Sequence, residues 1–191
     1  MCGIFGIIIS PAKRITFNTA KLTVNRLFRL SESRGSDSSG LSVLAGDMIQ
    51  VYKKAEKAST LIRNRDYNKF LSEALLGKNS RRTNKLDFRA KTIIGHTRMT
   101  TDGSENMHHN NQPLICDQTV GVHNGIVVNA DAVWAHFSNF SRKYEVDSEI
   151  IFRLIQYYID KKYTIHDSAI NTFQCIEGMT SIACMFGKRD F

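Results

Sequence analysis

The apolar positions in the first third of the chain follow two different spacings. Residues 3–9 form a short run of isoleucine, phenylalanine and glycine, which is typical of a buried strand. Over residues 17–31 the apolar residues recur three and four positions apart, and the pattern ends before Gly35, which predicts an amphipathic helix. A strand followed by a helix therefore opens the chain. The apolar positions of the predicted helix are Phe17, Ala20, Val24, Leu27, Phe28 and Leu30.

The next segment predicts two neighbouring strands and more helix. Residues 41–45 and 48–52 are short apolar runs, separated by only two residues, and they suit a pair of strands. A polar segment follows and extends to Gly77 with its apolar residues on one face, which indicates helix.

The second half of the chain predicts a mixture of strands and helices. Core strands are expected at 92–94 and 120–122, on either side of a polar loop at 100–112 that is rich in Asn, His, Gly and Thr. Loops of this kind often carry binding and catalytic residues. Because strands and helices are mixed and some strands are adjacent in sequence, the pattern favours α+β layers over a doubly wound parallel sheet. The remaining expected elements are helices at 130–140, 148–160 and 167–176 and a last strand at 179–186.

The composition is that of an ordinary globular protein. The chain has 191 residues, 42% of them apolar and 23% charged, which suits one domain over residues 1–191. No apolar run approaches the roughly 20 residues that span a bilayer, and the first residues lack the basic segment of a signal peptide. The four cysteines form no C-x-x-C pair, which indicates reduced thiols and a cytoplasmic protein.

The excess of positive charge is concentrated in one segment. The formal net charge is +8, and much of it lies at about residues 78–91. A nucleic-acid or acidic partner would suit such a segment, but a solvated basic loop is the simpler interpretation, so we do not expect nucleic acid as a partner. The six histidines, including His108 and His109, lack a ligand spacing, so no metal site or other cofactor is expected.

Cys2 is the first candidate for chemistry. When Met1 is removed, which is usual before a small residue, the cysteine carries a free α-amine. Such an amine has a pKa of about 7.7–8.0, so it can take the proton of the thiol in the same residue and later return it to a leaving group. Cys2 can therefore act as a nucleophile without a histidine, provided that Met1 is removed. Taken alone, a cysteine at position 2 is weak support for an enzyme.

Four segments in a fixed order strengthen this interpretation. They are MCGIFG at 1–6, SRGSDSSG at 33–40, GHTRMTTDG at 95–103 and VHNGI at 122–126. Together they resemble the motifs of class II (N-terminal cysteine) glutamine amidotransferases, most closely the glutaminase domain of glucosamine-6-phosphate synthases. The resemblance implies an Ntn-hydrolase-like four-layer αββα sandwich. It also implies glutamine as the substrate, hydrolysed through a Cys2 thioester that releases ammonia and glutamate.

The resemblance also implies roles for individual residues. The side-chain amide of Asn124 and the backbone N–H of Gly125 would form the oxyanion hole. Arg98 would bind the α-carboxylate of glutamine with its planar guanidinium, and Asp147 would bind the α-ammonium group. Other interpretations stay open on the residues alone. Asn124 and Gly125 also suit a hairpin turn, Arg98 a surface ion pair, and Asp147 a helix N-cap.

Four further residues match the family pattern less directly. Thr101 and the backbone of Asp102 would line the glutamine pocket, whereas Arg34 and Asp37 would brace the turn around the cysteine. The family usually continues from the arginine as tryptophan, alanine, threonine, histidine and glycine, and this chain has MTTDG at 99–103. The shape of the pocket and its coupling to an acceptor site are therefore expected to differ.

The end of the chain leaves several hypotheses open. The family continues with further strands after one that resembles residues 179–186, so the chain is a fragment lacking C-terminal strands, a natively short member, or a fold completed by a partner. The ammonia acceptor is then expected on a separate synthase or ligase protein, or within a homo-oligomer. A catalytically silent Ntn-fold assembly subunit is the second hypothesis, and a retained Met1 would favour it. Hydrolysis of another γ-glutamyl amide is the third.

Overall fold

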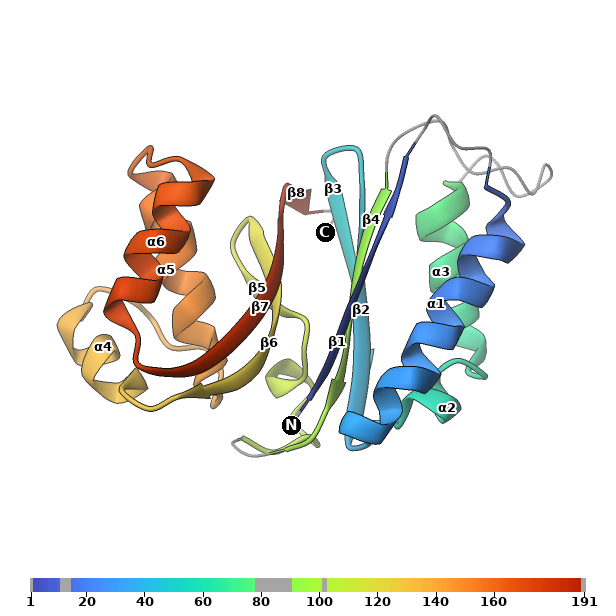
Figure 1. The fold of residues 1–191 in the computed structure, drawn as a ribbon, viewed down its shortest axis with the longest axis horizontal. Helices are drawn as coiled ribbons and strands as arrows, with labels where there is room; N and C mark the ends of the chain where they lie inside the picture. Colours follow the sequence, from blue (N-terminus) through green and yellow to red (C-terminus); the bar gives the residue numbers. More distant parts are fainter. Residues whose placement is uncertain (1, 11–14, 78–90, 101–102, 190–191) are drawn as a thin grey trace.

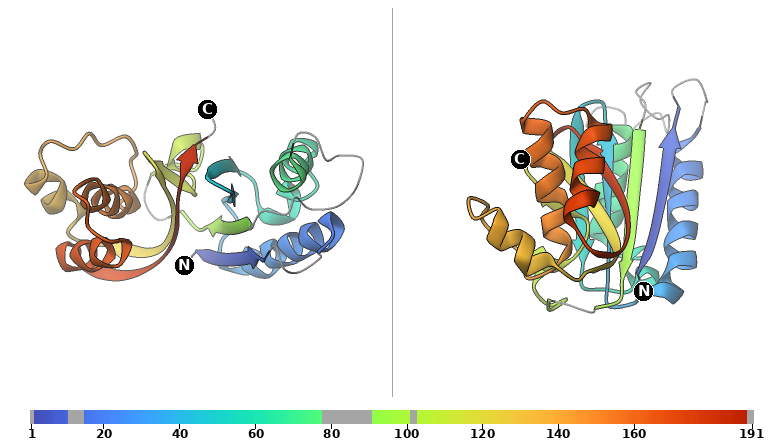
Figure 2. Two further views of the ribbon diagram at one scale, coloured as in Figure 1. Left: turned by 90° about the horizontal axis from the view of Figure 1, so that it is seen from above. Right: turned by 60° about the vertical axis from the view of Figure 1, so that its left-hand side comes forward.

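The computed structural model describes residues 2–10, 15–77, 91–100 and 103–189. Two β-sheets lie face to face between layers of helices (Figure 1). Seen from above in Figure 2, each sheet carries helices on its outer face. The expected α+β class and the four-layer αββα arrangement are confirmed.

The first sheet has the strand order β1-β4-β2-β3-β8. All neighbours in it are antiparallel except β8, which runs parallel to β3. The register places Gly3 opposite Thr97, so β1 brings the start of the chain to the end of β4. The strands are β1 (Gly3–Ile9), β2 (Ser38–Ala45), β3 (Met48–Lys54), β4 (Lys91–Arg98) and β8 (Lys188–Arg189).

The second sheet has three antiparallel strands in the order β5-β6-β7. They are β5 (Leu114–Cys116), β6 (Thr119–Val127) and β7 (Gly178–Phe186). The central strand β6 pairs with β7 along its whole length, from Thr119 to Val127. This pairing fixes the path of the VHNGI segment through the middle of the sheet.

Helices cover both outer faces, and side chains cap three of them. The side-chain oxygens of Thr16, Asn64 and Thr164 accept from backbone nitrogens in the first turns of α1, α3 and α6. None of the helices in the described part of the chain is both long enough and apolar enough to cross a membrane. The helices are α1 (Phe17–Ser31), α2 (Ala58–Leu61), α3 (Arg65–Leu76), α4 (Ala130–His136), α5 (Ser148–Asp160) and α6 (Ile165–Cys175), with 3₁₀ turns η1 (Glu32–Arg34) and η2 (His108–Asn110).

The apolar spacing predicted most elements but not all of their bounds. The strand at 3–9 and the helices at 17–31 and 148–160 have the predicted bounds. β4 and β6 extend several residues beyond the predicted cores, and the short strand β5 was not predicted. Of the predicted basic loop, residues 78–90 lie outside the described residues. Lys91 is 2% exposed and begins β4, so it is part of the sheet.

Aromatic side chains fill the core between the first sheet and its helices. Phe28 of α1 is fully buried, with its ring edge-on to the rings of Phe5 in β1 and Tyr67 in α3. Edge-on contacts of this kind add to the free energy gained from burying the rings. Phe28 therefore joins two helices to the sheet.

Gly121 allows α5 to pack closely against the second sheet. A Cβ atom on Gly121 of β6 would lie 2.1 Å from the ring of Phe152, a fully buried residue of α5. α5 can therefore pack directly against the backbone of β6. Between the two sheets, a third core cluster is formed by Ile49, Ile94, Val120, Val122 and Met185.

Removal of the Phe28 ring tests this account of the core. We expect Phe28→Ala to lower the free energy of unfolding by about 3–5 kcal/mol, because it leaves a cavity among buried rings. Leu22→Ala on the same helix is the control, since Leu22 is 70% exposed and its loss should change stability by less than about 0.5 kcal/mol. Urea denaturation followed by circular dichroism measures both. Equal losses in the two variants would contradict the assigned core.

Candidate active site

Cys2 lies just before β1, where segments distant in sequence meet. Its backbone nitrogen donates to Oδ1 of Asn124 in β6 at 2.8 Å. Its Sγ lies 3.5 Å from the carbonyl oxygen and 3.4 Å from the backbone nitrogen of Met99, the residue after β4. The Nε of Arg34 donates to the carbonyl oxygen of Cys2 at 3.2 Å. Three separate parts of the chain therefore hold this residue.

The surroundings of the Cys2 thiol favour its protonated form. Burial raises the pKa of the thiol above its ordinary value, and the backbone contact with Met99 only partly opposes this. Both hydrogen-bond contacts of Sγ within the described residues are to the backbone of Met99. A nucleophilic role for Cys2 therefore requires a base other than these neighbours.

Asn124 and Gly125 lie inside β6, where both pair with β7, so the hairpin-turn interpretation is wrong. Because Oδ1 of Asn124 accepts from the backbone nitrogen of Cys2, its Nδ2 group remains available as a donor. Gly125 has a φ of 151°, and a Cβ atom there would lie 1.8 Å from the carbonyl oxygen of Met179. Only glycine fits this position without a change in the backbone.

Arg98 is the last residue of β4 and is 3% exposed, so the surface ion pair is also wrong. Its Nη1 donates to Oδ1 of Asn111 at 2.8 Å, and its Nη2 donates to the carbonyl oxygen of Gly103 at 2.7 Å. The guanidinium therefore connects the two ends of the polar loop that follows β4. A rigid five-donor group suits such a position, since it can hold several acceptors in one plane.

The segment at 33–40 packs directly against the residues around Arg98. A Cβ atom on Gly35 would lie 2.4 Å from the carbonyl carbon of Arg98. The backbone nitrogen of Asp37 donates to the carbonyl oxygen of Arg98 at 3.0 Å, and Oδ2 of Asp37 accepts from the backbone nitrogen of Thr100 at 2.7 Å. Asp37 thus holds the backbone on both sides of Met99, the residue that contacts the Cys2 thiol.

Asp147 connects the start of α5 to the end of β6. Its Oδ2 accepts from the backbone nitrogen of Val127 at 2.7 Å, and its Oδ1 accepts from Oγ of Ser148 at 3.1 Å. Its side chain accepts no capping hydrogen bond from a backbone N–H in the first turn of α5, although it occupies the residue before that helix. The N-cap interpretation is therefore wrong for this side chain. The carboxylate instead anchors the strand that carries Asn124.

Known proteins are similar to this chain in sequence and in fold. Glutamine–fructose-6-phosphate aminotransferase of Wigglesworthia glossinidia brevipalpis is 32% identical over 162 residues, which is 82% of this chain and 22% of the relative. A solved structure of the allosteric regulatory enzyme of purine biosynthesis matches 96% of this chain with a TM-score of 0.67 and 21% identity. Glutamine phosphoribosylpyrophosphate amidotransferase of B. subtilis matches 97% with a TM-score of 0.63 and 20% identity. The chain belongs to the class II glutamine amidotransferases.

The class II amidotransferase sequence spans only part of the length of its relatives. It spans 22% of the first curated relative and 35% of each solved structure. No protein-family model matches it. The assignment of class therefore rests on sequence relatives and on the fold.

Two predicted substrate residues of the amidotransferase, Thr101 and Asp102, lie outside the described residues. The structure brings Cys2, Asn124 and Met99 into direct contact, and Arg34 contacts Cys2 through the backbone. The described residues contain no group of three or more His, Cys, Asp or Glu side chains arranged to hold a metal ion.

The amidotransferase motif VHNGI also takes part in a series of buried polar contacts that the sequence did not predict. Nδ1 of His123 lies 2.7 Å from Oγ of Ser148, which itself contacts Asp147. Because the serine donates to Asp147, it accepts from His123, which places the imidazole proton on Nδ1. Burial lowers the pKa of His123, so the ring is neutral at neutral pH. The histidine in VHNGI was the available signal, but its partner is distant in sequence.

Gly125→Ala tests the geometry of the amidotransferase strand β6. We expect a loss of about 1–3 kcal/mol in the free energy of unfolding, because the new Cβ atom would meet the carbonyl oxygen of Met179 in a φ region that suits glycine. Gly6→Ala in β1 is the matched control, since the nearest atom to its Cβ position is 3.7 Å away. Urea denaturation compares the two. The same small effect in both variants would show that Gly125 is not constrained.

Proposed function

We propose that the chain hydrolyses the side-chain amide of glutamine through a thioester at Cys2. The Cys2 thiol adds to the amide carbon, and its proton passes to the α-amine that Met1 removal exposes. The C–N bond then breaks, and the α-ammonium group returns the proton to the leaving nitrogen, which departs as ammonia. Water adds to the thioester, the C–S bond breaks, and glutamate leaves while the thiol regains its proton.

The hydrogen bond between the Cys2 nitrogen and Asn124 is the observation that supports this proposal most strongly. It places the future α-amine 2.8 Å from Oδ1 of Asn124, and the same side chain keeps its Nδ2 group for an oxyanion. The backbone N–H of Gly125 would be the second donor. Donors fixed before the reaction stabilise the negative charge of a tetrahedral intermediate without reorganisation.

The substrate's α-carboxylate and α-ammonium groups require partners of opposite charge. We assign the carboxylate to Arg98 and the ammonium group to Asp147, with Thr101 and the backbone of Asp102 lining the pocket. The Coulombic effect of Arg98 lowers the pKa of the Cys2 thiol and that of Asp147 raises it, which supports the nearness of both charges to the nucleophile. Arg34 and Asp37 support the site through the backbone.

The ammonia released at Cys2 would require an acceptor. The relatives' names include fructose 6-phosphate and phosphoribosylpyrophosphate, so a synthase or ligase that aminates a sugar phosphate is the acceptor class we propose. It would act as a partner protein or within a homo-oligomer, in the cytoplasm, where the Cys2 thiol stays reduced. A catalytically silent assembly subunit is the alternative, and a retained Met1 would favour it.

Intact mass spectrometry tests the nucleophile. The purified protein is weighed before and after treatment with a diazoketone analogue of glutamine, which alkylates the attacking thiol. We expect a starting mass without Met1 and a single adduct, because only Cys2 combines a thiol with the glutamine site. Cys2→Ala should form no adduct and release no glutamate, whereas the control Cys175→Ala should react like the unaltered protein. A retained Met1 with no adduct would favour the silent subunit.

Arg98→Lys tests the carboxylate site. An ammonium group cannot reproduce the planar contact of a guanidinium, so we expect the KM for glutamine to rise by about 10-fold or more while kcat changes less. Arg142→Lys is the control, because Arg142 forms an exposed ion pair with Asp131 on α4. Steady-state glutamate release measures both constants. An unchanged KM in Arg98→Lys would remove Arg98 from the glutamine pocket.

A further inference from the structure

Lys53 is a buried cation that the proposed chemistry does not use. The residue lies near the end of β3 and is 8% exposed. Its Nζ donates to the carbonyl oxygens of His109, Asn111 and Pro113, at 3.2, 2.5 and 3.1 Å. Three acceptors match the three donors of an ammonium group, which offsets part of the cost of burying the charge. Within the described residues, no carboxylate lies at ion-pair distance from this ammonium group.

The charge on Lys53 persists at neutral pH. Burial lowers its pKa to about 8, with a smaller contribution from the charge of Arg98. The ammonium form therefore predominates at pH 7 and supplies all three donors. The three carbonyl groups belong to one short segment, 109–113, so a single side chain fixes its path.

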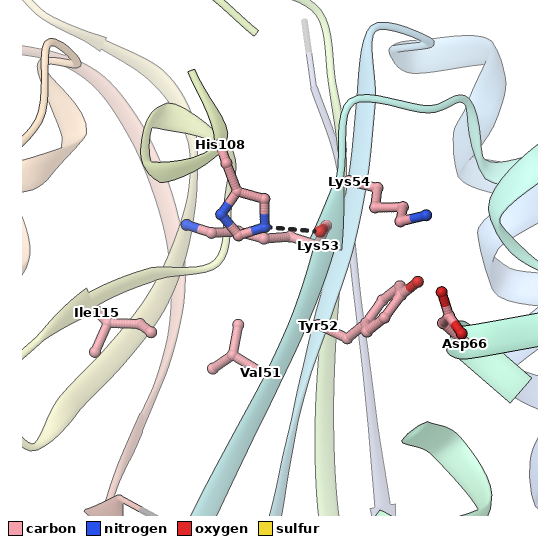
Figure 3. A pocket seen from close by; sticks show the side chains of 7 residues that line it. All are labelled: Val51, Tyr52, Lys53, Lys54, Asp66, His108 and Ile115. Atoms are coloured by element: carbon pink, nitrogen blue, oxygen red, sulfur yellow. Dashed lines mark hydrogen bonds between the residues drawn. The ribbon is translucent and has the colours of Figure 1, made fainter. Parts of the chain in front are cut away.

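The backbone of β2 and β3 forms the base on which this segment rests. Gly40 of β2 pairs with Lys53, and a Cβ atom on Gly40 would lie 2.3 Å from the carbonyl oxygen of Gln112. The carbonyl oxygen of Lys53 in turn accepts from Nε2 of His108 at 3.0 Å, as Figure 3 shows. Lys53 thus holds segment 109–113 through its side chain and the preceding residue, His108, through its main chain.

A cavity of about 320 Å³ lies beside Lys53, but it does not explain the buried charge. It is lined by Val51, Tyr52, Lys53, Lys54, Asp66, His108 and Ile115. Lys53 already directs its three donors to carbonyl groups, and Lys54 pairs with Glu56 at 3.6 Å. The role of Lys53 therefore lies in segment 109–113 and not in a ligand of this cavity.

Segment 109–113 leads from Lys53 to the proposed glutamine site. Asn111, whose carbonyl accepts from Lys53, uses its side-chain Oδ1 to accept from Arg98. The same side chain donates through Nδ2 to the carbonyl oxygen of Glu105 at 2.7 Å. Lys53, Asn111 and Arg98 therefore form one continuous set of hydrogen bonds that ends at the proposed carboxylate-binding group.

A second connection joins segment 109–113 to β6, the strand that carries the proposed oxyanion donors. Oε1 of Gln112 accepts from the backbone nitrogen of His123, the residue before Asn124, at 2.5 Å. β6 is also held by its pairing with β5 and β7. The guanidinium of Arg98, in contrast, takes no part in strand pairing and contacts the side chain of Asn111 directly. Loss of Lys53 is therefore expected to disturb Arg98 more than Asn124.

We infer that Lys53 is a positioning residue for glutamine, acting through Asn111 to orient Arg98. It does not touch the substrate. The inference rests on the proposed glutaminase function and identifies what sets its affinity for glutamine.

Steady-state kinetics of the full chain with Lys53→Met provide the test. We expect the KM for glutamine to rise by about 10-fold or more and kcat to change by less than about 3-fold. The reason is that a displaced Arg98 guanidinium weakens the binding of the ground state and of the transition state alike. Lys53→Arg should recover part of this loss by retaining the charge. Lys54→Met is the control and should keep the unaltered KM, because the adjacent Lys54 is only partly buried and pairs with Glu56. An unchanged KM in Lys53→Met, or an equal rise in Lys54→Met, would overturn the inference.

A second variant keeps the test decisive if Lys53→Met does not fold. Asn111→Ala leaves the backbone carbonyl groups that accept from Lys53 in place and removes the side-chain contacts with Arg98 and Glu105. We expect it to raise KM as Lys53→Met does, and the double variant to be no worse than either single one, since residues acting through one contact are non-additive. An unchanged KM in Asn111→Ala would overturn the inference.

Binding measurements separate this inference from the proposed function. Glutamine is titrated calorimetrically into Cys2→Ala protein with and without Asn111→Ala. The positioning role is supported if Cys2→Ala binds glutamine and the added Asn111→Ala change weakens this binding about 10-fold. Equal binding by both overturns the inference and leaves the glutaminase proposal intact. The proposed function is wrong if the unaltered protein releases no glutamate and the Cys2→Ala protein binds no glutamine. In that case the inference is wrong as well.

Discussion

The hydrogen bond from the Cys2 backbone nitrogen to Asn124 joins the two sheets at the start of the chain. Its geometry depends on two independent registers. The pairing of β1 with β4 sets where Cys2 lies along the first sheet, and the pairing of β6 with β7 sets where Asn124 lies in the second. A shift of one residue in either ladder would turn the side chains to the opposite face and separate the two groups. The core between the sheets, which includes Ile94 and Val122, keeps both registers in place.

Close backbone contacts make this meeting of strands possible. Gly35 allows the segment after η1 to lie against Arg98, Gly40 allows Gln112 to rest on β2, and Gly125 allows β6 to approach Met179. In each case the space for a side chain is already filled by backbone atoms. The glycines of the motifs are thus steric requirements of the site, and this explains why short glycine-containing segments carry so much of the resemblance to the family.

Much of the fold could be predicted from the sequence, but the contacts that orient the site could not. The helices at 17–31 and 148–160 each pack one face against a sheet, so their buried residues recur with the helical period. The apolar pattern alone therefore predicts these helices. β5 has three residues, too few to show a period. Asp147 precedes a helix, as an N-cap does, yet its carboxylate turns to Val127 because β6 ends beside it. The partners of Arg98 depend on the path of a polar loop, which local sequence does not determine.

The distance in sequence between Cys2 and Asn124 has a consequence during synthesis. The two residues are 122 positions apart, and β4, which places Met99 beside the thiol, comes between them. A growing chain that ends before Asn124 cannot assemble the site, and contacts of such long separation form late because the intervening loop must close first. The nucleophile is thus synthesised well before the strand that supplies its partner Asn124.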